Sequence, residues 1–512
     1  MNTKVRIHFC FDKPDRFFSR ETVKFFSVHR TFLILLCVLV VFLFYGNSSP
    51  LVDQDEAAYA GFSRSMMEKG DFLSMDFPYS TPHRKPPLHF WITSFLFKIF
   101  GPTEWVLRLF PAICILGTSL LTYHLAHIIY GQRTALYAFS ILSFSLYFPL
   151  NGKIALVDSL LVFFSMLGFV SLYHWIISYK KIFVFLFWLS VSLGLLVKGP
   201  PVLIFLGGTC VLLLSINQIR SKMWKLRPFL WLPVSLLPLL LWGYFSWQKD
   251  NGVLIRWMLD WYIFRRATDP VFGQSGPPGT YLMLFAITLF PWTRIYLSFL
   301  NEYGWKLIAY LKTEGLKLFK NLLPWNWEGI DSNFTPKRFL LMGLGFSWFF
   351  YECLASKLPS YPLSAYPILA IILGDQLSRK HNQIYMYRLY LTVSLIMIAI
   401  LSFVILPKFS ELRMDTKKVA DIIRTLVPPE ETLHSFGNQG IPSFAYYYHR
   451  PIQEITWDEI QTTKGYLLIA ESDFLIGKGL GLEWETKGEP FSIFAYDRNK
   501  KLTLRLVKTK KD

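Results

Sequence analysis

Residues 153–177 read KIALVDSLLVFFSMLGFVSLYHWII, an apolar run of bilayer length in which Asp158 is the single acidic residue. A transmembrane helix needs about 20 predominantly apolar residues. Several other stretches of this 512-residue chain meet that requirement, and only 17% of its residues are charged, against about one quarter in soluble domains. The sequence therefore predicts a polytopic membrane protein that is mainly α-helical.

About eleven membrane crossings are expected, one for each apolar run near bilayer length. Residues 54–69 and 88–100 carry apolar residues at helical spacing but do not suit a crossing, so we expect helices lying in the membrane interface. The expected spans are residues 31–47, 104–129, 132–150, 153–177, 182–198, 200–217, 229–248, 280–299, 339–355, 361–376 and 388–406.

Basic residues gather on one side of these spans, as the positive-inside rule requires of cytoplasmic segments. This distribution explains the net charge of +18 without a nucleic-acid partner. The N-terminus, which shows no cleavable signal, is therefore expected in the cytoplasm, and the segment 48–103 on the outer face. The basic positions lie in residues 1–30, at Arg133, Lys180 and Lys181, in residues 220–227 and 306–320, and at Arg379 and Lys380.

Three regions are expected along the chain. A basic cytoplasmic N-terminus covers residues 1–30, and a transmembrane region covers residues 31–406, with an outer catalytic loop at 48–103. Residues 407–512 are mixed polar and predict a small α/β domain on the outer face. Its expected elements are a helix at 416–426 and strands at 432–436, 466–470, 491–496 and 502–507.

Three carboxylates lie on the expected outer face. Asp55 and Glu56 open the first interfacial helix, where acids also serve as simple N-terminal caps. Asp158 lies between apolar residues near a membrane face, which costs free energy and marks it as a functional candidate. The alternative for Asp158 is an ion pair with Lys153 or Arg108.

Cations gather on the same face. Lys198 is expected either to extend its amine to the interface or to bind phosphate, and the others are Lys85, Lys357, Arg256, Arg265 and Arg266. Such a group would neutralise the oxygens of a lipid phosphate as the leaving group forms, while a carboxylate acts as general base toward an incoming hydroxyl. The pattern favours sugar transfer from a lipid phosphate. A lipid-linked sugar transporter, which would bury charges at mid-span in repeated halves, and a non-catalytic scaffold are the alternatives.

Short motifs then follow one another in a familiar order across residues 30–380. They are Asp55-Glu56 with Tyr59, Lys85-Pro86-Pro87 with Trp91, Arg108-Leu109-Phe110-Pro111, Asp158, Lys198-Gly199-Pro200, Pro291-Trp292, and Lys357-Leu358-Pro359 with Tyr361. This order resembles the GT-C glycosyltransferases, in particular the family of the aminoarabinose lipid A transferase and the dolichyl-phosphate-mannose protein mannosyltransferases.

The resemblance implies a GT-C helical bundle with about 11–13 spans in a bacterial inner membrane. It implies an inverting transfer from a polyprenyl-phosphate sugar to lipid A, lipopolysaccharide or protein, with Asp55 as the main catalytic carboxylate. The further implied site residues are Glu56 and Asp158 for catalysis, Lys85, Arg84, Lys198, Arg266 and Lys357 for the donor phosphate, and Tyr59 and Tyr361 for the substrate pocket.

Two positions depart from the family pattern. Arg84 stands where a Glu is common before Lys-Pro-Pro, and the stretch around Gln274 lacks the His that is often found there. In the lipid A enzyme these two positions resemble metal ligands. A divalent metal ion therefore stays open as a cofactor, and the alternative hypothesis is that Arg84 replaces the charge of that ion at the donor phosphate. His83 is an alternative ligand, although a structural role is expected for it.

Overall fold

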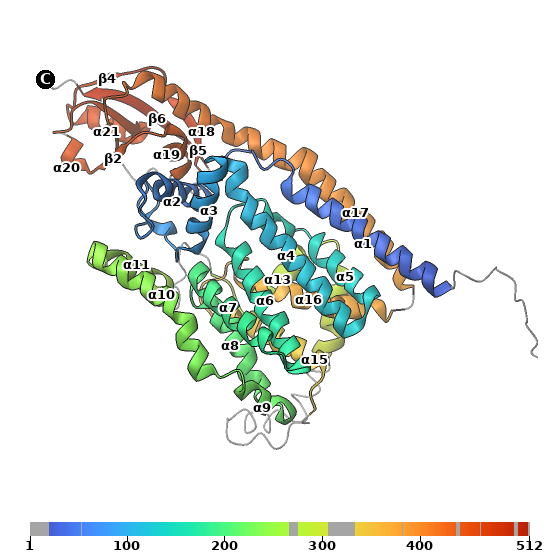
Figure 1. Cartoon of the computed structure of the whole chain (residues 1–512). Helices are drawn as coiled ribbons and strands as arrows, with labels where there is room; N and C mark the ends of the chain where they lie inside the picture. The colour runs from blue at the N-terminus through green and yellow to red at the C-terminus, as the bar shows by residue number, and fades with distance from the viewer. Residues whose placement is uncertain are drawn as a thin grey trace, which may run out of the picture.

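The computed structural model describes residues 20–52, 54–265, 275–305, 333–380, 382–436, 441–460, 462–495 and 500–509. A bundle of helices forms its larger part, with a small mixed sheet at one end (Figure 1). The helices that coincide with the expected spans are α1 (Arg20–Phe44), α4 (Glu104–Tyr130), α5 (Gln132–Ser143), α6 (Val157–Ser178), α7 (Lys181–Lys198), α8 (Pro201–Leu213), α10 (Pro228–Asp250), α13 (Thr280–Thr288), α15 (Pro336–Glu352), α16 (Ala365–Ser378) and α17 (Gln383–Ile400).

Five described helices are long and apolar enough to cross a membrane: Glu104–Tyr130, Val157–Ser178, Lys181–Lys198, Pro228–Asp250 and Gln383–Leu426. In four of the other expected spans the helices α5, α8, α13 and α16 are shorter than the sequence predicted. The 12 residues of α5 rise only about 18 Å, less than the roughly 30 Å of a hydrocarbon core. Proline explains some of these breaks, since α8 begins only at Pro201 and α13 ends before Pro291, and proline disfavours a helical residue ahead of it.

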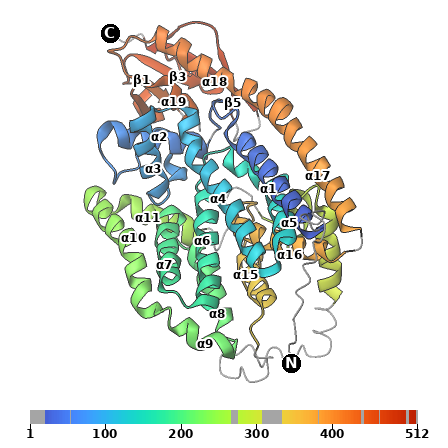
Figure 2. The ribbon, with the colours of Figure 1, turned by 45° about the vertical axis from the view of Figure 1, so that its right-hand side comes forward.

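The two helices expected in the first outer loop are present at the predicted positions. They are α2 (Asp55–Lys69) and α3 (Leu88–Phe100). Each contributes apolar side chains to one buried aromatic cluster, in which the rings of Tyr59 and Phe62 both meet Phe90 edge-on at 5.3 Å. This packing fixes α2, and with it Asp55, at the sheet end of the bundle (Figure 2).

The C-terminal region forms the predicted α/β domain. Its sheet has the strand order β2-β1-β3-β6-β4, with β5 paired to β6. The sequence missed the short strands β2 and β4. The elements are β1 (Leu433–Phe436), α19 (Pro442–Tyr448), β2 (Ile452–Ile455), α20 (Trp457–Ile460), β3 (Tyr466–Ala470), α21 (Glu471–Gly479), β4 (Trp484–Thr486), β5 (Phe491–Ala495) and β6 (Lys500–Thr509).

No break in the backbone marks the expected boundary at residue 406. Helix α17 continues through a π-helical turn, Leu401–Ile405, into α18 (Leu406–Leu426). Pro407 occupies the first turn of α18, where its missing N–H costs little. One long helix therefore carries the small domain from the bundle (Figure 1).

The small domain packs directly onto the first outer loop. The Leu51 N–H donates to the Tyr447 hydroxyl at 2.8 Å, and the Tyr446 hydroxyl donates to the Pro102 carbonyl at 2.9 Å. Arg64 of α2 donates to the Tyr446 carbonyl at 2.8 Å. Helix α2 is thus held between the bundle and the small domain.

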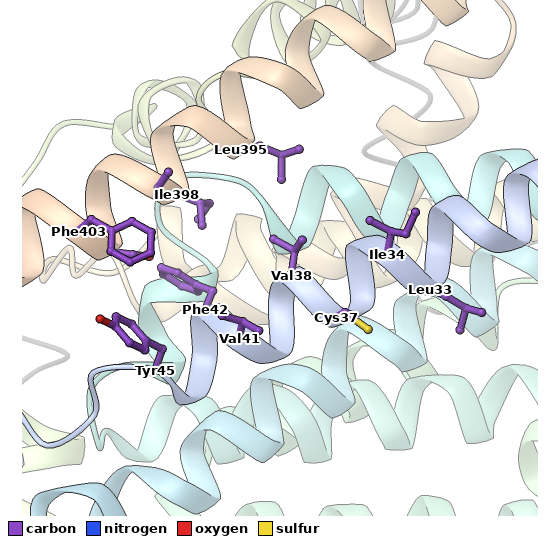
Figure 3. Close-up of a pocket in the computed structure, with 12 residues that line it drawn as sticks. Leu33, Ile34, Cys37, Val38, Val41, Phe42, Tyr45, Leu395, Ile398 and Phe403 are labelled. Carbon is purple, nitrogen blue, oxygen red and sulfur yellow. The ribbon is translucent and has the colours of Figure 1, made fainter.

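A groove of about 620 Å³ runs between α1 and α17. Figure 3 shows its side chains facing one another across the two helices, with Tyr45 and Phe403 at one end. None of the lining residues is charged, and Ile34, Val41 and Phe403 are more than half exposed. The groove therefore suits contact with lipid hydrocarbon rather than catalysis.

Candidate active site

Asp55 opens helix α2, and the next residue anchors it. The Glu56 carboxylate is fully buried and accepts two hydrogen bonds of 2.7 Å from the Arg108 guanidinium. It also accepts backbone N–H bonds of 2.8 Å from Val52 and Ala155. Burial would raise the pKa of Glu56, but the Arg108 charge and these hydrogen bonds lower it below its ordinary value. Glu56 is therefore an ionised group whose partners are all structural.

Arg108 of α4 also fixes the chain that leads into α2. Its guanidinium donates to the carbonyls of Asn47 at 2.8 Å and Pro50 at 3.3 Å, and to Ser49. The loop between α1 and α2 is thus tied to the bundle at several points. This explains how an irregular segment can hold Asp55 in a defined place.

The Asp55 side chain is about half exposed. Its Oδ1 lies 2.9 Å from Nδ1 of His83 and accepts a 3.3 Å hydrogen bond from the Tyr59 hydroxyl. Gln54 is the N-cap residue and makes no side-chain cap bond, so Asp55 does not serve as a simple cap. The surrounding protein would raise the pKa of Asp55, but the His83 hydrogen bond and the charges of Lys85 and Lys198 lower it well below its ordinary value.

Asp158 pairs with neither Lys153 nor Arg108. Its Oδ1 lies 2.6 Å from Nζ of Lys198, and both side chains are about one-tenth exposed. Gly199 directly after Lys198 has a φ of +78°, a conformation that glycine adopts at little cost, and the turn brings the end of α7 beside the start of α6. Lys153 instead donates to the carbonyls of Phe42 and Tyr45 at the end of α1.

A cavity of about 880 Å³ adjoins these residues. Its polar lining includes Lys85, Lys198, Tyr262 and Tyr361. Nζ of Lys85 donates to the Tyr262 hydroxyl and lies 4.0 Å from the centre of that ring. The rest of the wall is mostly apolar and comes from α7, α8, α10, α11 (Val253–Leu259) and α15, including Leu195, Ile204, Leu236, Leu240, Ile255, Met258 and Phe350.

Asp55 and Tyr59 lie within electrostatic reach of the polar lining. The charges of Lys85 and Lys198 act on Asp55, and Tyr262 and Asp158 act on Tyr59. Burial is the main reason that the pKa of the Tyr59 phenol lies well above its ordinary value. The structure therefore brings Tyr262 together with six residues that were predicted from the sequence. These six are Asp55, Tyr59, Lys85, Asp158, Lys198 and Tyr361.

Two predicted phosphate ligands lie outside the cavity lining. Nζ of Lys357 donates to the Tyr351 and Glu352 carbonyls at the end of α15. The Arg84 guanidinium donates to the Met75 carbonyl at 3.1 Å, and its burial lowers its pKa. Arg266 and Gln274 fall outside the described residues.

Sequence reasoning missed Tyr262, and for His83 it expected a structural role, with metal binding as the alternative. Tyr262 lies in the π-helical turn Asp260–Arg265, inside an aromatic run of the outer loop. That run, Trp257 to Phe264, was a usable signal, because aromatic residues beside loop arginines are common in binding sites. The contact of His83 with Asp55 spans 28 positions and had no local signature.

Few of the side chains at this site are of the types that bind metal ions. Asp55, His83 and Asp158 share the site with two lysines, one of which is paired with Asp158 at 2.6 Å, and in the described ranges no group of three or more His, Cys, Asp or Glu is placed to hold a metal ion. Metal sites built by proteins use several such ligands. The described residues therefore do not fit a protein-held divalent ion.

Residues 30–249 match the family of dolichyl-phosphate-mannose-protein mannosyltransferases. A protein of Aquifex aeolicus is 29% identical over 353 residues, which are 68% of this chain and 64% of that protein. The undecaprenyl phosphate-alpha-4-amino-4-deoxy-L-arabinose arabinosyl transferase of Photorhabdus laumondii is 30% identical over 119 residues, which are 23% of this chain and 21% of the enzyme. The chain thus matches less than two thirds of the length of either relative.

The fold extends the likeness to nearly the whole chain. The structure of ArnT from Cupriavidus metallidurans bound to undecaprenyl phosphate superposes with a TM-score of 0.70 at 16% identity, covering 93% of this chain and 98% of ArnT. The candidate spans and these bacterial relatives describe a bacterial membrane protein. The chain therefore has the GT-C fold of ArnT, and its residues 30–249 are similar to the dolichyl-phosphate-mannose-protein mannosyltransferases.

Proposed function

We propose that this protein transfers a sugar, with inversion, from a polyprenyl-phosphate donor to an acceptor of the bacterial envelope. The acceptor is lipid A, lipopolysaccharide or a protein. One observation carries the proposal: a long apolar cavity has a cationic, tyrosine-lined part beside a half-exposed carboxylate. An amphiphilic lipid phosphate fits both parts of such a cavity.

The donor phosphate lies at Lys85, Lys198 and Tyr262. Ammonium groups and a phenol hydroxyl are donors suited to phosphate oxygens. The polyprenyl chain follows the apolar walls given by α8, α10 and α15. ArnT bound to undecaprenyl phosphate shows that this fold admits such a lipid.

Asp55 acts on the acceptor. Its low pKa keeps it ionised near neutral pH, so it accepts the proton of an attacking hydroxyl as the new bond to the anomeric carbon forms and the bond to the phosphate oxygen breaks. The phosphate leaves with its electron pair, and the lysines offset its charge. When the acceptor is itself a phosphate, no base is needed, and Asp55 orients the reacting groups.

Asp158 acts through Lys198. The 2.6 Å ion pair fixes the ammonium group at the cavity wall. Lys198 lines the cavity, whereas Asp158 is not among the lining residues. Asp158 therefore positions a phosphate-binding cation rather than meeting the acceptor.

Transfer proceeds without a divalent metal ion in this proposal. The support is the donor set, in which the charges of Lys85 and Lys198 act on the Asp55 carboxylate. Chelator should leave the initial rate unchanged. Loss of activity in chelator, with recovery on adding a divalent ion, would refute metal independence.

The site faces the outer side of the inner membrane in this proposal, with the N-terminus in the cytoplasm. Helix α6 begins at the site with Asp158 in its first turn, and helix α7 ends there with Lys198. The other ends of both helices therefore lie about one bilayer thickness away. Lys180 and Lys181 lie at those other ends, where the positive-inside rule expects cytoplasm. Labelling single cysteines at Lys180 and Glu485 with an impermeant thiol reagent tests the orientation.

The function is tested with purified protein in proteoliposomes that contain envelope lipid acceptors and a radiolabelled polyprenyl-phosphate sugar. Label on an acceptor supports the transferase. Label that only crosses the bilayer supports a lipid-linked sugar transporter. Glu68→Gln is a matched control, because Glu68 is an exposed acid on the same helix as Asp55.

A further inference from the structure

His83 is the residue closest to the Asp55 carboxylate that the reaction above leaves without a role. Its Nδ1 lies 2.9 Å from Oδ1 of Asp55, and its ring is about one-tenth exposed. It ends the short 3-10 helix Thr81–His83, and its backbone N–H donates to the Ser80 carbonyl at 3.0 Å. The short helix therefore fixes the backbone of His83, and with it the position from which the ring reaches Asp55.

The direction of the hydrogen bond follows from the ionisation of Asp55. A carboxylate only accepts hydrogen bonds, so Nδ1 of His83 must carry the proton whether the ring is neutral or charged. The Tyr59 hydroxyl donates to the same oxygen, Oδ1, at 3.3 Å. Both of these hydrogen bonds therefore fall on Oδ1 of a side chain that is about half exposed.

We propose that His83 is a positioning residue for Asp55 in the transfer reaction. Nδ1–H holds Oδ1, so that Oδ2 meets the acceptor. This inference rests on the proposed function, since it presupposes that Asp55 meets the acceptor. It also assigns to His83-Arg84-Lys85 three separate tasks: the histidine orients the carboxylate, the arginine holds the Met75 carbonyl, and the lysine lines the cavity.

The consequence for rate follows from geometry. Without its hydrogen bond to Nδ1 the carboxylate rotates more freely, and misplacement of a catalytic group by about 1 Å can lower a rate about 100-fold. Lys85 and Lys198 bind the donor independently of His83, so donor affinity should change little. The loss should therefore appear in kcat rather than in KM for the donor.

The test compares His83→Ala with His83→Asn. The asparagine amide offers an N–H donor at nearly the position of Nδ1, whereas alanine offers none. We expect kcat to fall about 10- to 100-fold in His83→Ala and to recover to within about 5-fold of wild type in His83→Asn, with KM for the donor within about 2-fold in both. His127→Ala, at an exposed histidine near the far end of α4, is the control, and thermal unfolding confirms that each variant is folded.

The outcomes distinguish this inference from the function on which it rests. Wild-type kcat in His83→Ala, together with an inactive Asp55→Asn, would overturn the role of His83 and leave the function intact. Full activity in Asp55→Asn would overturn the function itself. If wild-type activity needs an added divalent ion and His83→Asn raises the concentration required, His83 is a metal ligand and the positioning role is wrong.

Discussion

Replacing Arg108 with methionine should destabilise the protein strongly, because it strands a buried carboxylate. Arg108 and Glu56 are 1% and 0% exposed, and their closest atoms are 2.7 Å apart. Methionine fills much of the same volume but leaves Glu56 with only its two backbone donors, Val52 and Ala155. Removing one partner of a buried ion pair typically costs about 3–5 kcal/mol.

The magnitude is calibrated by a pair in the same chain whose arginine is exposed. Arg379 lies 2.7 Å from Asp375 on α16, and the two side chains are 63% and 14% exposed. Exposed pairs contribute about 0–1 kcal/mol, so Arg379→Met should leave stability almost unchanged. The difference between the two arginine variants isolates the effect of burial from the loss of a charge.

The assay is equilibrium or thermal unfolding in matched detergent micelles, followed by tryptophan fluorescence. Arg108→Met and Glu56→Gln should both unfold well before Arg379→Met and wild type, and any remaining folded fraction should keep measurable transfer. A Glu56→Gln variant that unfolds like wild type but has lost transfer would refute the structural assignment. It would make Glu56 a catalytic carboxylate, as the family resemblance implied.

Three further predictions follow from the cavity and from Asp55. Lys85→Met should lower kcat/KM about 100-fold, as loss of a group that stabilises the leaving phosphate does, and Lys85→Arg should recover part of it; equal rates in all three proteins would contradict phosphate binding by Lys85. Ile204→Trp places a large ring in the apolar part of the cavity and should raise KM for a long-chain donor about 10-fold or more but affect a short-chain analogue little; equal effects on both donors would show that the chain lies elsewhere. The pKa of Asp55 is lowered in the folded protein, so its ionised form stabilises the fold above its unfolded pKa of about 4, and this contribution is lost as pH falls further. The difference in unfolding midpoint between wild type and Asp55→Asn should therefore be constant from pH 5 to 8 and shrink below about pH 4, and a change near pH 6 would contradict the ionised state.

Much of the fold follows from local patterns. Apolar runs of bilayer length predicted the helices of the bundle, and a short strand-like run predicted β3 at 466–470, where the structure has Tyr466–Ala470. Helix ends were less predictable. The change to mixed polar composition suggested a boundary at residue 406, but Pro407 lies in the first turn of a helix, where it is tolerated, and α17 continues into α18.

The site was predictable in composition but not in pairing. Asp158 and Lys198 were both expected on the outer face, yet their ion pair depends on the packing of α6 against α7, which one sequence does not reveal. Lys357 matches a family motif, but its amine lies near the end of α15, where carbonyls without helical partners attract a cation. His83 and Tyr262 reach the site only through contacts between distant segments.

The central claim is that Asp55 serves sugar transfer from a polyprenyl-phosphate donor bound at Lys85 and Lys198. The most direct measurement is single-turnover transfer of labelled sugar by wild type, Asp55→Asn and Glu68→Gln in the same proteoliposomes. We expect the label to reach a hydroxyl acceptor with wild type and Glu68→Gln, and at least about 100-fold more slowly with Asp55→Asn, while donor binding is retained. Transfer by Asp55→Asn at the wild-type rate, or no transfer by the wild type to any envelope acceptor, would contradict the claim.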